Sequence, residues 1–327
     1  MKCIVTGAAG FIGSHLVDQL VKEGHKVYAI DNFTTGSKKN LSLSVKKIKI
    51  KKMDITNLSK LKKSNIFKNV NWVFHLAGLA DIVPSINKPS EYFDSNVKGT
   101  LNILEVSKNK NLKKFIYAAS ASCYGIPKKF PTNENSIIDT KYPYALTKHL
   151  GEQLVMHWAN VYKMPNLSIR FFNVYGPRSR TTGAYGAVFG VFLSQMINDH
   201  PLTIVGDGKQ TRDFVYVSDV VSGLIKAAKS KHKKKIYNLG SGKETSVNDI
   251  AKLISSKTTQ IPFRPGEPLR SKADIKKFKK DFNWAPKIKV KQGVNNLLLN
   301  IKLWKRAPLW TKDKIHKATK AWFKYLK

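Results

Sequence analysis

The 327 residues are 42% hydrophobic, which is enough for a sizeable core, and only two cysteines occur, which excludes a disulfide framework and a cysteine-rich metal site. The formal net charge of +37 would suit a nucleic-acid binder, but the lysine runs at 46–52 and 231–235 carry no nucleic-acid-binding motif. We therefore favour solvated lysine surfaces and expect no specific nucleic-acid partner. No signal-peptide pattern opens the chain, and no apolar run reaches the roughly 18 residues that cross a bilayer, so we expect a cytoplasmic protein without a membrane partner.

Short apolar runs alternate with amphipathic stretches in the first half of the chain. Strands are expected at 2–6, 26–30, 72–76, 115–119 and 167–172, and helices at 12–23, 91–108 and 144–162. This alternation predicts an α/β fold with a doubly wound parallel sheet. After residue 176 the pattern becomes irregular, with a helix expected at 188–198 and a turn at 206–208. We therefore expect a dinucleotide-binding domain over 1–175 and a smaller mixed α/β substrate-binding region, interleaved with it, over 176–327.

A glycine-rich turn follows the first predicted strand in the pattern G-x-x-G-x-x-G. The cofactor-binding residues predicted there are Gly7, Gly10, Phe11, Ile12 and Gly13. Glycine allows the tight turn and lets the backbone approach a pyrophosphate at a helix N-terminus. The second strand ends at Asp31, about 20 residues on, where a carboxylate binds ribose hydroxyls and repels the 2′-phosphate of NADP. The pattern predicts NAD, although Lys38 and Lys39 leave some room for NADP.

Tyr144 and Lys148 lie one helical turn apart and should project from the same face. A tyrosine pKa near 10 makes a poor base, but a lysine cation and a positive nicotinamide ring should both lower it. The phenolate could then take a proton from a sugar hydroxyl while a hydride leaves the same carbon. Tyr-x-x-x-Lys alone could be a chance pair on a solvated helix, and the glycine turn argues against that interpretation.

The two motifs together resemble the extended short-chain dehydrogenases/reductases of the NAD-dependent epimerase/dehydratase family, and in particular UDP-glucose and UDP-N-acetylglucosamine 4-epimerases. The resemblance runs from residue 1 to about residue 284 and includes Asp54-Ile55, His75-Leu76-Ala77-Gly78 and Asn96–Thr100. It implies that these segments respectively contact adenine, line the cofactor cleft and support the strand that carries the catalytic serine. The further cofactor-binding residues that it implies are Asn32, Asp54, Ile55, Leu76, Ala77, Gly78, Asn96, Tyr144, Lys148 and Phe172.

The resemblance places the catalytic hydroxyl five positions before Gly125, at Ser120, with Ser122 as a helper or as a simple cap of the turn. The 4,6-dehydratases of the family typically carry an Asp-Glu pair directly after this position, and the decarboxylases usually keep the Glu. Here Ala121 and Ser122 stand there, and neither can act as a carboxylic acid. The expected reaction is therefore 4-epimerisation, by transient oxidation to a 4-keto sugar and return of the hydride to the opposite face.

The substrate side is expected in the second half of the chain. The predicted substrate-binding residues are Ser120, Ser122, Asn173, Arg178, Arg212, Arg264 and Ser271. Arg212 and Arg264 would grip the diphosphate of a nucleotide sugar, although surface salt bridges are the alternative. Ser271 aligns where simple hexose epimerases often carry tyrosine, so it leaves space for a 2-acetamido group. The segments 118–124 and 181–187 also resemble epimerases of N-acetylated sugars, which favours a UDP-N-acetylhexosamine over UDP-glucose or UDP-galactose.

Several alternatives stay open. Within the family, a dehydratase or a reductase would use the same residues, and a reductase would release oxidised cofactor at each turnover. A different class is a catalytically idle NAD-binding or nucleic-acid-binding protein, and the intact Ser120, Tyr144 and Lys148 argue against it. The predicted helices at 91–108 and 144–162 resemble those that form a dimeric four-helix bundle in the family, so we expect a homodimer.

Overall fold

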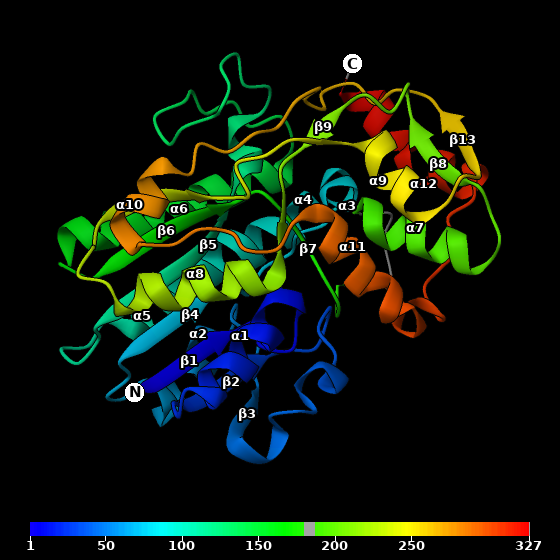
Figure 1. Cartoon of the computed structure of the whole chain (residues 1–327). Coiled ribbons are helices and arrows are strands. Elements are labelled where there is room, and N and C mark those ends of the chain that lie inside the picture. Colours follow the sequence, from blue (N-terminus) through cyan, green and yellow to red (C-terminus); the bar gives the residue numbers. More distant parts are fainter. Residues whose placement is uncertain (180–186, 327) are drawn as a thin grey trace.

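Seven parallel strands form the central sheet of the computed structural model, which describes residues 1–179 and 187–326 (Figure 1). The strands are β1 (Lys2–Thr6), β2 (Lys26–Asp31), β3 (Ile48–Lys52), β4 (Trp72–His75), β5 (Lys114–Ser120), β6 (Asn166–Phe171) and β11 (Lys235–Leu239). Their order is β11-β6-β5-β4-β1-β2-β3, so the direction of winding reverses between β1 and β4. The doubly wound α/β prediction is confirmed, and the reversal places a crevice at the carboxyl ends of these two strands.

The inner strands are apolar along their whole length because helices cover both of their faces. In β1, Ile4 and Val5 are both fully buried, and they join the hydrophobic clusters on opposite faces of the sheet. At the edge, β3 alternates exposed lysines with half-buried Ile48 and Ile50. Such charges on an edge strand disfavour pairing with a further strand.

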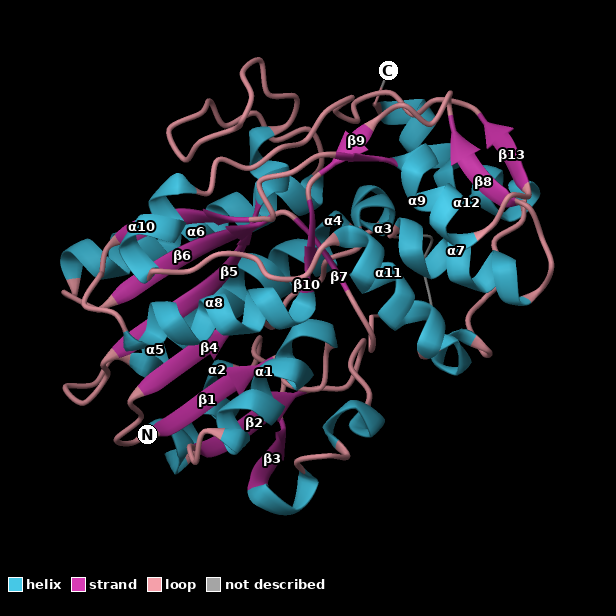
Figure 2. Cartoon of the chain, viewed as in Figure 1, coloured by secondary structure: helices cyan, strands magenta, loops and turns pink. Residues whose placement is uncertain are grey.

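Helices flank the sheet in two layers, as the colouring of Figure 2 makes clear. One face is covered by α1 (Phe11–Lys22), α8 (Val217–Lys229) and α10 (Lys276–Phe282), and the other by α2 (Leu58–Lys63), α5 (Gly99–Ser107) and α6 (Pro143–Val161). The strands and helices predicted for the first half lie within two residues of the observed bounds. The helix expected at 91–108 is divided into α4 (Pro89–Phe93), a π-helical turn at Asp94–Lys98, and α5.

A second, smaller unit packs beside the carboxyl ends of the strands (Figure 1). It contains α7 (Val188–Ile197), β8 (Leu202–Val205), α9 (Val247–Ile254), β13 (Thr258–Ile261), α11 (Val290–Leu299) and α12 (Lys312–Tyr325). Its apolar cluster includes Phe192, Ile250, Leu297, Trp304 and Trp322. The short elements that connect or flank the two units are α3 (Ile82–Asn87), β7 (Asn173–Tyr175), β9 (Thr211–Arg212), β10 (Phe214–Tyr216) and β12 (Thr245–Ser246).

The chain crosses between the two units more than once. After β8 it returns to the sheet through β10, which pairs with β7, and then through α8 and β11. The stretch after residue 175 therefore contributes to both units, and the division at 175/176 stays a prediction. Over residues 1–179 and 187–326, no helix is long and apolar enough to cross a membrane.

Candidate active site

A cavity of about 890 Å³ follows the carboxyl ends of the strands and extends between the sheet and the smaller unit. It brings most of the predicted site residues together. Those that line it are Gly7, Gly10, Phe11, Ile12, Gly13, Asp31, Asn32, Asp54, Ile55, Leu76, Ala77, Gly78, Ser120, Ser122, Tyr144, Lys148, Phe172, Asn173, Arg212, Arg264 and Ser271. Their individual roles stay predictions, but their convergence on one cavity satisfies the geometric condition for a shared site.

The glycine turn brings the N-terminus of α1 to the cavity. Gly7 has a φ of +68°, and a Cβ there would lie 2.8–2.9 Å from the backbone of the segment after β4. A Cβ on Gly13 would lie 2.1 Å from the Gly7 carbonyl oxygen. No side chain caps the helix at Gly10. Only glycine fits this close approach, and the helix start faces the cavity as a pyrophosphate site requires.

Asp31 ends β2 and lies at the adenosine side of the predicted dinucleotide site. Its carboxylate accepts hydrogen bonds from the backbone N–H groups of Ala9 (2.9 Å) and Phe33 (2.7 Å). Burial raises the pKa of Asp31, and these two bonds oppose the rise. A carboxylate has about four acceptor sites, so it can also accept ribose hydroxyls. Lys38 and Lys39 could favour NADP, but neither is among the described residues that line the cavity. The surroundings of Asp31 therefore fit NAD.

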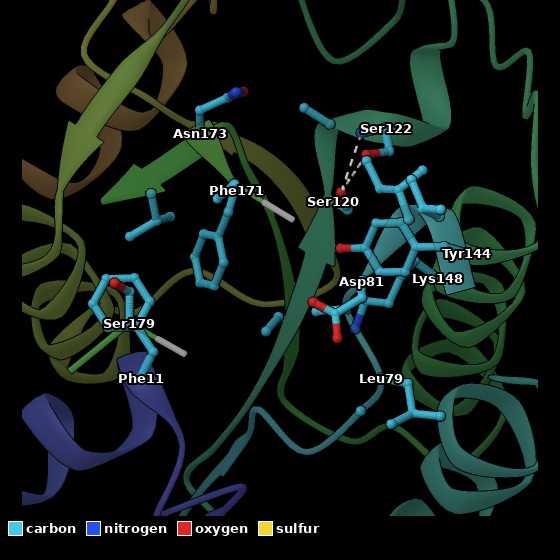
Figure 3. A pocket seen from close by; sticks show the side chains of 18 of the residues that line it. Phe11, Leu79, Asp81, Ser120, Ser122, Tyr144, Lys148, Phe171, Asn173 and Ser179 are labelled. Atoms are coloured by element: carbon cyan, nitrogen blue, oxygen red, sulfur yellow. Dashed lines mark hydrogen bonds between the residues drawn. The ribbon is translucent and has the colours of Figure 1, made fainter. Parts of the chain in front are cut away.

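Ser120, Tyr144 and Lys148 meet on one wall of the cavity (Figure 3). Ser120 is the last residue of β5, and Tyr144 lies in the first turn of α6, directly after Pro143. The Ser120 hydroxyl lies beside the Tyr144 phenol (Figure 3) and donates a hydrogen bond of 3.1 Å to the Ser122 hydroxyl. Lys148 is 7% exposed, one helical turn after Tyr144. The sheet and α6 therefore hold a phenol, an amine and a hydroxyl together as proton transfer to a sugar requires.

Burial is the main influence on the pKa values of Tyr144 and Lys148. It raises the pKa of Tyr144, because the opposing Ser120 hydrogen bond is outweighed and the Asp81 carboxylate adds to the rise. Burial also lowers the pKa of Lys148 to about 7, although Glu152 acts in the opposite direction. In the chain without its cofactor, burial thus disfavours both charged forms, and the lowering of the phenol pKa by Lys148 stays a prediction.

Arg212, Arg264 and Glu267 lie together in another part of the cavity. Glu267 lies 3.6 Å from the Arg212 guanidinium and 3.2 Å from that of Arg264. Arg212 also donates to the Pro268 carbonyl oxygen at 2.8 Å. Each guanidinium carries five donors, so both can contact a diphosphate as well as Glu267. Ser271 lines the same side, while residues 181–186 of the segment predicted to favour N-acetylated sugars lie outside the described chain.

Two predicted residues do not line the cavity. The Asn96 amide instead holds the Leu79 backbone through bonds of 2.9 and 3.1 Å and donates to Thr147 at 3.1 Å, so Asn96 supports the segment after β4 from behind. Arg178 pairs with Asp18 of α1 at 2.7 Å. The cofactor role of Asn96 and the substrate role of Arg178 stay predictions that the lining of the cavity does not support.

Among the cavity residues that were not predicted from the sequence, Asp81, Tyr142 and Trp322 have side chains suited to the site. Asp81 follows the segment after β4, and Figure 3 shows its carboxylate turned toward the same space as Tyr144. Tyr142 lies two positions before Tyr144, and Trp322 comes from α12 near the end of the chain. Proximity to the motifs could have indicated the first two. Nothing local in the sequence connects Trp322 to the site.

Residues 3–240 match the model of the NAD dependent epimerase/dehydratase family, which is well over half of the chain. The chain belongs to this family. NAD is accordingly its cofactor. The UDP-glucuronate 4-epimerase of Thermodesulfobacterium geofontis is 34% identical over 327 residues, with 95% of this chain and 96% of that protein covered. Decarboxylases of UDP-glucuronic acid are also among the relatives of this chain in the family.

Solved structures of family members show the same architecture. The UDP-glucose 4-epimerase of Thermotoga maritima, solved with UDP-glucose, superposes with a TM-score of 0.86 at 30% identity, covering 94% of this chain and 99% of that one. The UDP-N-acetylglucosamine 4-epimerase of Methanobrevibacter ruminantium, solved with UDP-N-acetylmuramic acid, gives a TM-score of 0.84 at 31% identity, covering 91% and 98%. These relatives act on or bind UDP-sugars, and they differ in the sugar and in the reaction.

Proposed function

We propose that this family member is a 4-epimerase of a UDP-sugar. The observation that carries the proposal is the pair Ala121 and Ser122, which directly follows Ser120 at the cavity wall. An elimination needs a carboxylic acid there to protonate the leaving group, and neither side chain can supply one. The complete Ser120, Tyr144 and Lys148 wall supports oxidation and reduction at a single carbon. A dehydratase or reductase is the runner-up within the family.

The chain's own residues manage the proton in this reaction. When bound, NAD supplies the hydride acceptor that becomes the donor in the return step. Tyr144 takes the proton of the C4 hydroxyl while Ser120 holds that oxygen by a hydrogen bond. Lys148, with a pKa lowered to about 7 by burial, can hold or release a proton behind the phenol at neutral pH. After the 4-keto sugar has turned, Tyr144 returns the proton to the new hydroxyl.

For the sugar, we favour a UDP-N-acetylhexosamine, with UDP-glucose and UDP-galactose second. Arg212 and Arg264 exchange part of their contact with Glu267 for the diphosphate, which brings two cations to two phosphates. Ser271 leaves space beside the second carbon of the sugar. The similarity to an N-acetylglucosamine epimerase supports the first choice, and the similarity to a glucose epimerase supports the second.

We also propose that the protein is a homodimer. The helices α4 and α6, which follow the family pattern for a dimeric bundle, expose large apolar side chains: Phe93 is 51% exposed and Leu146 45% exposed. Exposed apolar side chains on neighbouring helices favour a buried interface. Light scattering of the purified protein tests this, and a mass of 36.9 kDa would contradict it.

A panel of UDP-sugars tests the reaction. The protein is incubated with NAD and each of UDP-N-acetylglucosamine, UDP-glucose and UDP-glucuronic acid, without added reductant, and the products are identified by NMR. The expected product is the C4 epimer of the accepted sugar. A 4-keto-6-deoxy sugar or a pentose as the main product would overturn the proposal in favour of elimination or decarboxylation.

A further inference from the structure

The C-terminal helix α12 reaches the cavity from outside the part of the chain that matches the family model. That part ends at residue 240, whereas α12 spans Lys312–Tyr325 and is drawn in red in Figure 1. Most of its side chains face solvent, but Trp322 is 1% exposed and lines the cavity. Helix α12 also packs against α3, which follows Asp81. Among the described residues of α12, Trp322 is the one that lines the cavity.

Trp322 holds the loop that carries the diphosphate-binding arginine. Its indole Nε1 donates a hydrogen bond of 2.8 Å to the carbonyl oxygen of Pro265. Pro265 directly follows Arg264 and lies two positions before Glu267, which contacts both arginines. Because the bond fixes the backbone beside Arg264, it limits the movement of that side chain relative to the cavity.

The other contact of Trp322 leads to the catalytic wall. The indole packs on the ring of Tyr142, with centroids 5.5 Å apart and planes inclined by 44°. Tyr142 and Ser122 both line the cavity, and the Ser122 side chain lowers the pKa of the Tyr142 phenol against the larger effect of burial. Ser122 accepts a hydrogen bond from Ser120 at 3.1 Å, and the Ser120 side chain lowers the pKa of the neighbouring Tyr144 phenol (Figure 3). The hydroxyl groups of Tyr142, Ser122 and Ser120 thus lie between the Trp322 indole and the Tyr144 phenol.

We infer that Trp322 is a positioning residue that joins the two sides of the substrate site. Through Pro265 it holds the diphosphate loop, residues 264–267, in place. Through Tyr142 it orients the hydroxyls of Ser122 and Ser120. This inference rests on the proposed function for the second contact, because only an acting Tyr144 makes the hydroxyl line matter for rate. The first contact is independent of the reaction, since it concerns binding of the nucleotide diphosphate.

Trp304 offers a matched control for the interpretation that Trp322 is only part of the core. Both indoles belong to the same apolar cluster, and Trp304 is 0% exposed. Within the described residues, however, Trp304 does not line the cavity and its Nε1 has no hydrogen-bond partner. Replacement of either residue by phenylalanine removes the same atoms from the same cluster. Only Trp322→Phe also removes a bond to the diphosphate loop.

The test compares Trp322→Phe, Tyr142→Phe and Trp304→Phe with the wild type. For each protein, the NAD content, the Kd of UDP by calorimetry, and kcat for the accepted UDP-sugar are measured. Trp322→Phe should raise the Kd of UDP roughly three- to ten-fold, as the loss of one hydrogen bond implies, with a smaller change in kcat. Tyr142→Phe should lower kcat roughly three- to ten-fold while it raises the Kd less than Trp322→Phe does. Trp304→Phe should bind UDP and turn over like the wild type.

If Trp322 and Tyr142 only stabilised the core, their variants would not affect the Kd of UDP and kcat differently. Equal effects of Trp322→Phe and Trp304→Phe on the Kd of UDP would overturn the inference, and so would an unchanged Kd in Trp322→Phe. If the wild type binds UDP but converts no UDP-sugar, the proposed function is wrong and the Kd comparison alone decides on Trp322. A wild type that does not bind UDP would overturn both.

Discussion

The two sides of the cavity are built in different ways. The cofactor side consists of the glycine turn after β1, Asp31 at the end of β2, and Ser120 at the end of β5, all placed by one parallel sheet. The substrate side consists of Arg212, Arg264 and other residues from segments that meet only through tertiary packing. The first side is therefore fixed by local geometry, while the second depends on how distant segments hold one another.

We therefore predict that residues on the cofactor side determine kcat, and that residues on the substrate side determine the affinity for UDP and the choice of sugar. The largest effect should come from Tyr144→Phe, which removes the acid/base group and should lower kcat about 10²- to 10⁴-fold. The variant should still fold and retain NAD, because the ring stays in place. Turnover is followed by NMR and cofactor content by absorbance after denaturation. Tyr325→Phe, at a 63% exposed position, is the control, and near-normal turnover of Tyr144→Phe would refute its catalytic role.

Burial of the Lys148 amine should lower the free energy of unfolding of the protein at neutral and acidic pH. Its pKa of about 7 in the folded chain lies below its ordinary value of 10.5. The unfolded chain therefore binds more protons between these values, and the free energy of unfolding should rise with pH across that window. Lys148→Met removes the buried amine, so its advantage over wild type should be greater at pH 6 than at pH 10, by on the order of 3 kcal/mol.

Urea unfolding of cofactor-free protein at the two pH values measures this difference. Lys320→Met, on the exposed side of α12, is the control and should show no such pH dependence. A pH-independent difference between Lys148→Met and the wild type would mean that Lys148 keeps its ordinary pKa despite burial.

Arg212 tests the affinity side of the comparison. Arg212→Gln removes one of the two guanidinium groups proposed to bind the diphosphate, so it should raise the Kd of UDP roughly ten- to hundred-fold while leaving the NAD content unchanged. Calorimetry measures the affinity. Arg306→Gln, at an exposed position that does not line the cavity, is the matched control. If the two variants bind UDP equally well, Arg212 serves only as a partner of Glu267.

Ser271 tests the choice of sugar. Ser271→Tyr should lower the ratio of kcat/KM for UDP-N-acetylglucosamine over UDP-glucose about five- to hundred-fold, because overpacking penalises the larger acetamido group. Ser271→Ala keeps the position small and should leave the ratio unchanged. A ratio that does not move in Ser271→Tyr would remove Ser271 from the sugar pocket. A wild type that rejects the acetylated sugar would reverse our preference for it.

The same contrast explains what the sequence could predict. The glycine turn, Asp31 and the Tyr144–Lys148 pair depend on residues close in sequence, and their elements lie within two residues of the predicted bounds. The strands β3 and β11 were outside the predicted ranges. Edge strand β3 is rich in lysine, and β11 follows a lysine run far from the other strands. Hydrophobic pattern is weakest where a strand is exposed or isolated in the chain.

Long-range contacts account for the remaining differences in the site. Arg178 turns to Asp18, and Asn96 supports Leu79, because partners distant in sequence compete for these side chains. The protonation of Tyr144 and Lys148 depends on burial, which spacing along a helix does not reveal. Trp322 reaches the cavity through the packing of α12.

The central claim is that one sugar carbon is oxidised and then reduced without exchange of its hydrogen. UDP-N-acetylglucosamine labelled with deuterium at C4 tests this directly, when it is incubated with the protein and NAD in ordinary water and the products are examined by NMR. The account predicts UDP-N-acetylgalactosamine that keeps its deuterium at C4. Loss of the deuterium to water, or its appearance at C6 of a 4-keto-6-deoxy sugar, would contradict the account.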